Sequence, residues 1–457
     1  MQPTRARGGA VKLALRALTA NLLLAAGAHA GVAADPSSDL ADDTGLTRID
    51  AAVLFYKEAG GRIRATEPVV AATLNGTGGG VLSVKLTETS LTGATPNGAT
   101  AATRVQTFVA PASAPGSTTT VTSPSGRSRL VVIPGTGVVT RQYDAAAGVL
   151  PMDYGFHDRR TAFNVGYSAP FGEASRWSAG AAYSHELDYR SYDFNFGVSR
   201  DFNHRNTTVS AMANLEFDQS KPQFGDPEPL TPMSGTAKGG GDSKTVSSLL
   251  IGVTQVMSRR WITQLSYNIG KSEGYQTDPY RVVSVLDSTT GDPLTYLYEG
   301  RPRSRLRQSL YWGNKVSVGP TVTDVSVRGY HDDWGITSFT GEIAERVDIT
   351  RWFYVEPSFR YYQQSAADFF VNYLKSGDPT PAFASSDSRL GKFDATTVGV
   401  KLGFKVLGNG ELYCVYEDYK QNGKGPSANT DPAFALQNQF TGVDAKSAMV
   451  GYTFAFY

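Results

Sequence analysis

The feature that most constrains this chain is an alternation of apolar and polar residues that persists through whole segments. In "SYDFNFGVSRDFNHRNTTVSAMANLEFDQS", residues 191–220, nearly every second residue is apolar or aromatic on both sides of "RDFNHRN". Side chains of a strand point alternately to opposite faces, so the pattern predicts two β-strands with one apolar and one polar face. Asn203 and Asn206 suit the turn between them.

The same alternation predicts thirteen strands from residue 158 onward. They span residues 158–170, 175–187, 189–201, 205–219, 243–257, 260–274, 304–318, 320–334, 336–349, 351–365, 392–406, 409–421 and 445–457. Three weaker segments precede them, at 48–57, 62–74 and 81–89. Most of these strands are longer than the ~5–6 residues typical of soluble sheets and long enough for the ~9–11 residues of a tilted transmembrane strand.

The connections between the predicted strands alternate in length. Short turns at "FGEA", "FNHR", "SRR", "GPT", "ITR" and "GNG" alternate with a second set that includes long loops at 220–242, 275–303, 366–391 and 422–444. Bacterial outer-membrane barrels have short periplasmic turns and longer extracellular loops. The predicted fold is therefore all-β: a transmembrane antiparallel up-and-down β-barrel of about sixteen strands. Fourteen strands is the alternative if the first two segments fail.

Composition and the N-terminus agree with this reading. Hydrophobic residues make up 40% of the chain, and after the first 30 residues no apolar run approaches the ~20 that a spanning helix needs. A helical membrane protein is therefore excluded. The net charge of +1 gives no argument for a nucleic-acid partner. Residues 1–30 read as a signal peptide that ends in Ala28-His29-Ala30, which predicts export to the bacterial outer membrane.

The predicted domain organisation follows from these segments. Residues 31–46 form a periplasmic N-terminal segment, and residues 47–457 form the barrel. Residues 92–152 are rich in Thr, Ala, Pro and Ser and read as a long, partly disordered extracellular loop or insertion. A small separate N-terminal domain is the alternative. The single cysteine, Cys414, excludes an internal disulfide framework.

Alternation also assigns faces to individual residues. Tyr192, Phe194 and Phe196 are expected to face lipid, and Asp193 and Asn195 to face the lumen. Aromatic residues at strand ends are expected at the membrane interfaces; the tryptophans among them are Trp177, Trp261, Trp334 and Trp352. The charged candidates for the lumen wall are Glu216, Arg305, Arg307, Asp324, Arg328, Glu356, Arg360 and Lys401.

The chain ends in "SAMVGYTFAFY", which resembles the C-terminal signal that outer-membrane assembly machinery recognises. The alternating aromatic residues are Tyr452, Phe454 and Phe456, with Tyr457 one residue beyond that phase. The assembly machinery is therefore an expected partner, together with outer-membrane lipid, lipopolysaccharide and a periplasmic protein.

Several longer segments resemble an uncharacterised outer-membrane family, catalogued as domain of unknown function 3570. They include "RDFNHRNTT", "LLIGVTQVMSRR", "GYQTDPYRVVSVLD" and "RYYQQSAADFF", and the resemblance runs from about residue 47 to residue 457. The resemblance implies a bacterial outer-membrane β-barrel with no established substrate. It also implies a connection to an envelope redox or cofactor pathway, through neighbouring genes.

Two motifs raise the question of catalysis or metal binding. "SHELD" places Ser184 beside His185, but neighbours in a strand point to opposite faces, so a nucleophile and its base cannot easily meet there. "HDDWG" could hold a cation through Asp332 and Asp333, although a polar hairpin tip with an interfacial Trp334 is favoured. We therefore expect no catalytic residues, no metal and no cofactor.

Three further segments bear on the lumen. Arg301, Arg303, Arg305 and Arg307 could form a ladder that sets anion preference, or a solvated wall, or a rim that binds lipopolysaccharide phosphates. The 275–303 loop is rich in ordered-looking residues and either constricts the lumen or extends strands beyond the membrane, with the second slightly favoured. "KGGGDSK" at 238–244 lacks the spacing of a phosphate-binding loop and is interpreted as a flexible connecting segment.

The sequence thus supports a pore or transporter for small polar solutes as the first function. A structural or partner-bound barrel that serves an envelope redox or cofactor pathway is the alternative, and an outer-membrane hydrolase is a minor one.

Overall fold

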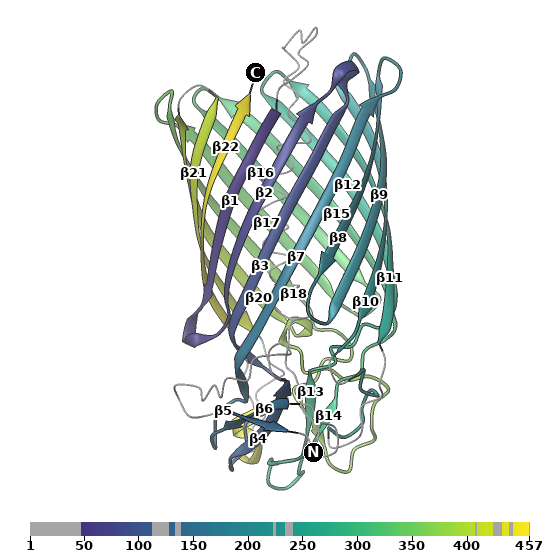
Figure 1. Cartoon of the computed structure of the whole chain (residues 1–457), viewed down its shortest axis with the longest axis vertical. Helices are drawn as coiled ribbons and strands as arrows, with labels where there is room; N and C mark the ends of the chain where they lie inside the picture. Colours follow the sequence, from purple (N-terminus) through teal and green to yellow (C-terminus); the bar gives the residue numbers. More distant parts are fainter. Residues whose placement is uncertain are drawn as a thin grey trace.

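The fold is a closed antiparallel barrel of sixteen strands (Figure 1). The computed structural model describes residues 47–111, 128–132, 139–222, 225–233, 241–406, 409–423, 432–437 and 442–456. The barrel strands, in order around the wall, are β1 (Thr47–Glu58), β2 (Arg64–Asn75), β3 (Val81–Pro96), β7 (Met152–Pro170), β8 (Ser175–His185), β9 (Tyr189–Phe202), β10 (Thr207–Ser220), β11 (Asp242–Ser258), β12 (Trp261–Gly274), β15 (Ser304–Val318), β16 (Thr321–Asp332), β17 (Thr337–Asp348), β18 (Phe353–Gln364), β20 (Phe393–Val406), β21 (Gly410–Gly423) and β22 (Val443–Phe456).

Each predicted segment corresponds to one of these strands, so sixteen is the correct count. The weak first segment is a full wall strand, because β1 pairs with β2 on one side and with β22 on the other, which closes the barrel. The opening hairpin is β9–β10, paired from Tyr189↔Ser220 to Phe202↔Thr207.

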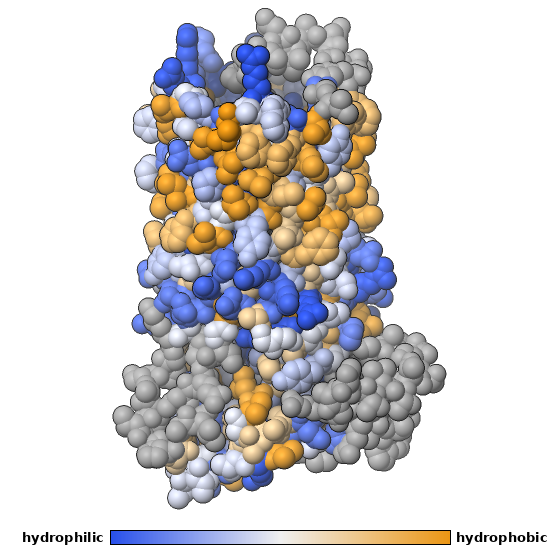
Figure 2. Space-filling model, turned by 90° about the vertical axis from the view of Figure 1, so that its left-hand side faces the viewer, coloured by the Kyte–Doolittle hydropathy of each residue, from blue (hydrophilic) through white to orange (hydrophobic). Residues whose placement is uncertain are grey.

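The outer face carries the apolar residues and the inner face the polar ones. Phe194, Phe196 and Val198 of β9 are exposed on the outside, as are Val209 and Leu215 of β10. Figure 2 shows the side of the barrel that carries β21 and β22, where an orange belt of apolar residues crosses the half nearest the short turns and a hydrophilic band lies directly beyond it. A belt of this kind faces the hydrocarbon of a membrane.

The two ends of the barrel differ. At one end, short turns join the strands; at the other, long loops fold together beyond the wall (Figure 1). These loops contain two small sheets, in the orders β4–β6–β5 and β14–β13–β19. The strands of these two sheets are β4 (Gln106–Pro111), β5 (Ser128–Val132), β6 (Val139–Ala145), β13 (Val282–Leu286), β14 (Pro293–Tyr298) and β19 (Leu374–Lys375). Four short 3-10 helices lie between strands: η1 (Ala59–Gly61), η2 (Thr77–Gly79), η3 (Ser388–Leu390) and η4 (Pro432–Gln437). Of these, η2 lies in one of the short turns at the opposite end.

One expectation for the loops needs correction. The 275–303 loop does not extend the barrel strands, because β13 and β14 form a separate hairpin whose third strand is β19. The described parts of the first long loop are packed: Phe108 and Tyr143 are buried together with Val282 and Tyr298 of the 275–303 loop. A contact of this kind needs loops from distant strands to meet, which local alternation does not report.

Some predictions fall outside the described residues. Residues 1–46, which contain the expected signal peptide and periplasmic segment, and Tyr457 lie there. In β22, Val450, Tyr452 and Phe456 are exposed on the outer face, in the phase expected for the C-terminal aromatic residues. Among the described helices, none has the length and apolar character needed to cross a membrane.

Candidate functional site

The inner wall of the barrel is chemically asymmetric. Strands β15 to β21 present large charged and aromatic side chains to the lumen, in alternation with the apolar residues of the outer face. This wall holds seven of the eight predicted charged residues: Arg305, Arg307, Asp324, Arg328, Glu356, Arg360 and Lys401. Glu216 lies on the inner face of β10 and accepts a hydrogen bond from Ser191.

Several charges on this wall are neutralised by neighbours. The Arg305 guanidinium lies 2.8 Å from the Asp332 carboxylate, and Lys315 lies 3.3 Å from Asp324. Lys401 lies 3.9 Å from Glu411. Pairs of this kind fix the geometry of the wall but leave little net charge for a passing solute.

Three arginines of the wall form no ion pair with any described residue: Arg307, Arg328 and Arg360. Arg360 is the direct cross-strand neighbour of Glu342, and Arg328 experiences the charges of both. The Arg328 guanidinium also lies 5.5 Å from the centre of the Tyr311 ring. An arginine with unsatisfied donors is suited to a carboxylate or phosphate ligand.

Tyrosines shape the part of the wall nearer the short turns. The Tyr354 ring lies across Gly403, where a Cβ would come within 2.1 Å of it. Its hydroxyl donates to Glu411 at 2.6 Å, and the Arg346 guanidinium stacks 3.7 Å from the ring centre. A glycine is needed at position 403 because only the bare backbone leaves room for the ring.

The inner faces of the neighbouring strands β8 to β12 carry many small residues. The inner faces of β8, β9, β10, β11 and β12 carry Ser178, Gly180, Ala182, Asn195, Gly197, Ser210, Ser248, Gly252, Ser266 and Gly270.

The described parts of the long loops close over the end of the barrel opposite the short turns and are called the cap here; they lie within residues 97–151, 221–241, 275–303, 365–392 and 424–442. Going around the wall, loop 97–151 joins the third and fourth strands, loop 275–303 the ninth and tenth, and loop 424–442 the fifteenth and sixteenth. Their anchors are therefore spread around the rim. The Thr100 amide nevertheless donates to Ser284 Oγ at 2.9 Å, and Gln437 donates to Ala101 O at 2.8 Å and to Gly291 O at 3.3 Å. Hydrogen bonds between such distant loops require the chain to cross the mouth.

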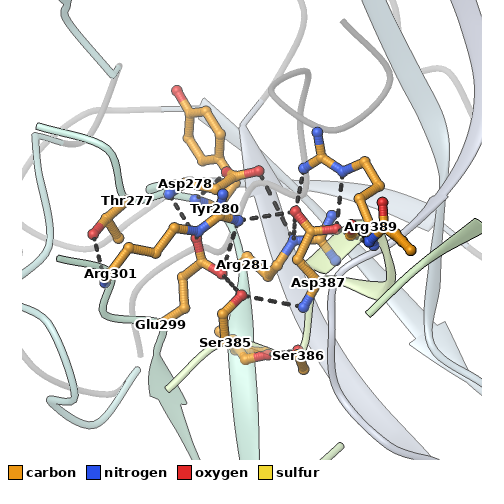
Figure 3. Close-up of polar contacts among 12 residues, drawn as sticks. Thr277, Asp278, Tyr280, Arg281, Glu299, Arg301, Ser385, Ser386, Asp387 and Arg389 are labelled. Atoms are coloured by element: carbon orange, nitrogen blue, oxygen red, sulfur yellow. Dashed lines mark hydrogen bonds and ion pairs between the residues drawn. The ribbon is translucent and has the colours of Figure 1, made fainter. Parts of the chain in front are cut away.

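A buried ionic network joins two loops of the cap (Figure 3). Arg301 lies 2.7 Å from Glu299 and 2.9 Å from Asp387, which belongs to the other loop. The remaining members are Asp278, Arg281 and Arg389, with Arg281 3.7 Å from Asp387. Glu299 and Asp387 are almost fully buried, so their charges depend on these partners.

The network changes the acidity of its members. Burial would raise the pKa of Asp387, but Arg281, Arg389 and Arg301 together hold that pKa well below its usual range. Burial raises the pKa of Asp278 to about 6 against the opposing effect of Arg281. Asp387 is therefore the anion on which the arginines converge, whereas Asp278 can take up a proton near pH 6.

The expected arginine ladder is divided among three settings. Arg301 belongs to the cap network, and Arg303 is exposed beside Asp242 at 3.0 Å. Only Arg305 and Arg307 lie on the inner wall. The cluster is therefore not a continuous ladder, because the chain leaves the loop and enters β15 within those seven residues.

The "HDDWG" hairpin is organised by protein groups. Asp332 accepts hydrogen bonds from Arg305, Tyr330 and the amides of Trp334 and Ile336. Among the described residues no cluster of metal ligands is present. Trp334 is not interfacial, since it is buried against Phe369 of loop 365–392 and donates to Ser304 O.

The "SHELD" residues lie as the strand argument requires. Ser184 is buried on the inner face, whereas His185 is exposed on the outer face. The two side chains are not brought together.

Sequence reasoning missed the most highly organised polar site, the cap network. Asp387 lies 86 positions from Arg301, and nothing local marks either as buried. The one available signal was the acidic and basic density of "TDPYR", "YEGRPR" and "SSDSRLG" within loops that also contain apolar residues.

Comparison with known proteins identifies one family. The family model described as "Protein of unknown function (DUF3570)" matches residues 13–454. Among curated proteins, none matches the sequence.

Similar solved structures include three proteins from Pseudomonas aeruginosa. OccK5 (OpdH) is 6% identical with a TM-score of 0.40, covering 90% of this chain and 98% of that one. OccD3 (OpdP) is 8% identical with a TM-score of 0.40, covering 91% and 92%. The ferric enterobactin receptor (PfeA) is 9% identical with a TM-score of 0.41, covering 82% of this chain but only 54% of the receptor.

Proposed function

Since the chain belongs to the DUF3570 family, whose description assigns no solute, we propose from the geometry that it is an outer-membrane channel or transporter for small polar solutes. The observation that carries the proposal is the inner wall. Arg307, Arg328 and Arg360 lie on the inner face of a closed sixteen-strand barrel and have no ion pair among the described residues, and the inner faces of β8 to β12 carry many Gly, Ser and Asn residues. A barrel of this size encloses a lumen wider than its own side chains fill.

The solutes that suit this wall carry an anionic group. Arg328 and Arg360 lie close enough for their charges to repel, and a carboxylate or phosphate between them relieves that repulsion. Glu342 beside Arg360 restrains the preference, so the expected selectivity for anions is weak.

Planar-bilayer recordings of the purified full chain test the proposal. The wild-type protein should conduct, and Arg328→Gln with Arg360→Gln should lower the anion-to-cation permeability ratio without abolishing conductance. Lys420→Gln is the matched control, because Lys420 is exposed on the outer face of β21 and should not alter selectivity. Failure of the intact protein to conduct would count heavily against a passive channel.

A second candidate function is favoured by the cap. Loops that cross the mouth and are joined by a buried ionic network suit a barrel that is held closed until a partner or solute moves the cap. Silence of the wild-type protein, together with conductance after the network is broken, would favour this candidate. Crosslinking of intact envelopes followed by pull-down would identify the partner that it requires.

A further inference from the structure

Three cations form a lateral row on the outer face of the barrel, across β2, β1 and β22. The strand register places Lys57 directly opposite Arg64 on one side and directly opposite Lys446 on the other. All three side chains are exposed. Adjacent strands lie about 4.8 Å apart, so the three charges form a compact strip rather than scattered surface lysines.

The strip borders the apolar belt at its extracellular edge. Lys57 lies two residues beyond the exposed Phe55, on the same outer face, and Lys446 lies four residues from the exposed Val450. Figure 2 shows this boundary, where the orange belt gives way to a blue band on the side of the barrel that carries β21 and β22. Thr92 lies beyond Arg64 in the row, and Asp418 lies beyond Lys446.

Like charges placed directly opposite each other destabilise a sheet. Within the described residues, none of the three cations has a carboxylate within ion-pair distance. Lys446 forms no ion pair even with Asp418, its direct cross-strand neighbour. Two other outward cations near this end are paired, Arg159 with Glu88 and Lys271 with Glu273 at 2.7 Å, whereas Arg190 and Lys420 are exposed on the outer face without an ion pair among the described residues. The strip differs from single outward cations because its three charges are direct cross-strand neighbours.

We propose that the strip formed by Arg64, Lys57 and Lys446 binds the phosphate groups of lipid A in the outer leaflet, while the belt below it receives the acyl chains. Lysine and arginine form charge-assisted hydrogen bonds with phosphate oxygens, and basic residues beside a bilayer attract anionic headgroups. A phosphorylated headgroup over the strip relieves the repulsion between the three cations. The site rests on the outer-membrane placement proposed above, but it is independent of conduction.

Binding of lipid A to the purified full chain in a neutral detergent tests the site. The probes are lipid A, its dephosphorylated form and inorganic phosphate. Each cation removed by Lys57→Gln, Arg64→Gln or Lys446→Gln should weaken lipid A binding roughly fivefold, and the triple variant roughly a hundredfold. Lys271→Gln, a paired outward lysine near the same end, is the matched control and should change the affinity little.

The outcomes separate the possible ligands. Preference of the wild-type protein for lipid A over the dephosphorylated form, lost in the triple variant, supports the site. Equal affinity of the two proteins for lipid A overturns it. Competition by millimolar inorganic phosphate, with no preference for the lipid, would assign the strip to free phosphate and also overturn it.

Folding of each variant is checked by the resistance of the closed barrel to detergent unfolding on a gel. If the triple variant does not assemble, the comparison of Lys57→Gln with the charge-conserving Lys57→Arg decides the question, since only the first should lose affinity. A barrel that binds lipid A but does not conduct leaves the site intact and removes the proposed channel. A barrel that conducts but does not bind lipid A overturns the lipid A site and leaves the proposed channel intact.

Discussion

The barrel and the cap organise their residues in opposite ways. In the barrel, large apolar side chains such as Phe196 and Leu215 are exposed on the outside, and the polar residues face inward. In the cap, Phe108, Val282 and Leu286 are buried, and even the charged Asp387 is withdrawn from solvent. The solvent outside each region explains the difference, because the barrel wall faces hydrocarbon and the cap faces water.

This contrast means that the same substitution should have different consequences in the two regions. A charge on the outer wall is a defect against lipid, whereas removal of a charge from the cap is a defect in a buried network. The variants below test that difference in order of expected effect.

The largest effect is expected from Phe196→Lys on the outer face of β9. A lipid-facing lysine near the bilayer midplane raises the free energy of the inserted barrel by about 2–4 kcal/mol. This cost opposes membrane insertion. Assembly should be impaired, measured as the fraction of chain that becomes a detergent-resistant barrel.

The neighbouring Asn195→Lys is its matched control, because Asn195 faces the lumen from the same strand. Near-normal assembly is expected for it. If both variants assembled equally well, the assignment of faces on β9 would be wrong.

The next effect is expected from Asp387→Asn in the cap. Three arginines converge on this carboxylate, and loss of one partner from a buried ionic network costs about 3–5 kcal/mol. The cap should become sensitive to limited proteolysis within loop 365–392 while the barrel stays intact, and conductance in planar bilayers should rise.

Asp378→Asn, an exposed position in the same loop, is the control and should leave the proteolysis pattern unchanged. Unfolding of the whole barrel by Asp387→Asn would contradict the separation of the two regions.

The smallest effect is a dependence of the cap on pH. The pKa of Asp278 is about 6 in the folded cap, raised by burial above the ordinary value of 3.8. The folded cap therefore holds this proton more tightly than the unfolded chain does. The protonated Asp278 contributes its full stabilisation of the cap below about pH 4, and this stabilisation is lost as the pH rises through about 6. Proteolysis of the cap should accelerate over that range and then level off.

Asp278→Asn should flatten this dependence. Asp226 in loop 221–241 also has a pKa of about 6, raised by burial and by Asp242, so Asp226→Asn separates the two contributions. An unchanged pH profile in Asp278→Asn would assign the dependence to another group.

Much of the barrel was predictable from the sequence because its determinants are local. A strand has a side-chain period of two, and the alternation of residues such as Phe194, Asn195 and Phe196 directly reports which face meets lipid. The parity of short and long connections reports the two ends. Strand number and the facing of Arg328, Arg360 and Lys401 follow from these local signals, whereas β3 ends seven residues later and β7 begins six residues earlier than the sequence predicts.

The cap and the register of charges were decided by tertiary structure. Asp387 meets Arg301, and Thr100 meets Ser284, only because closure of the barrel brings distant loops over one mouth. Lys57 meets Lys446 only because the first strand pairs with the last. The alternation within a strand determines its faces; which strand becomes its neighbour, and which loop covers the end, depends on closure of the whole sheet.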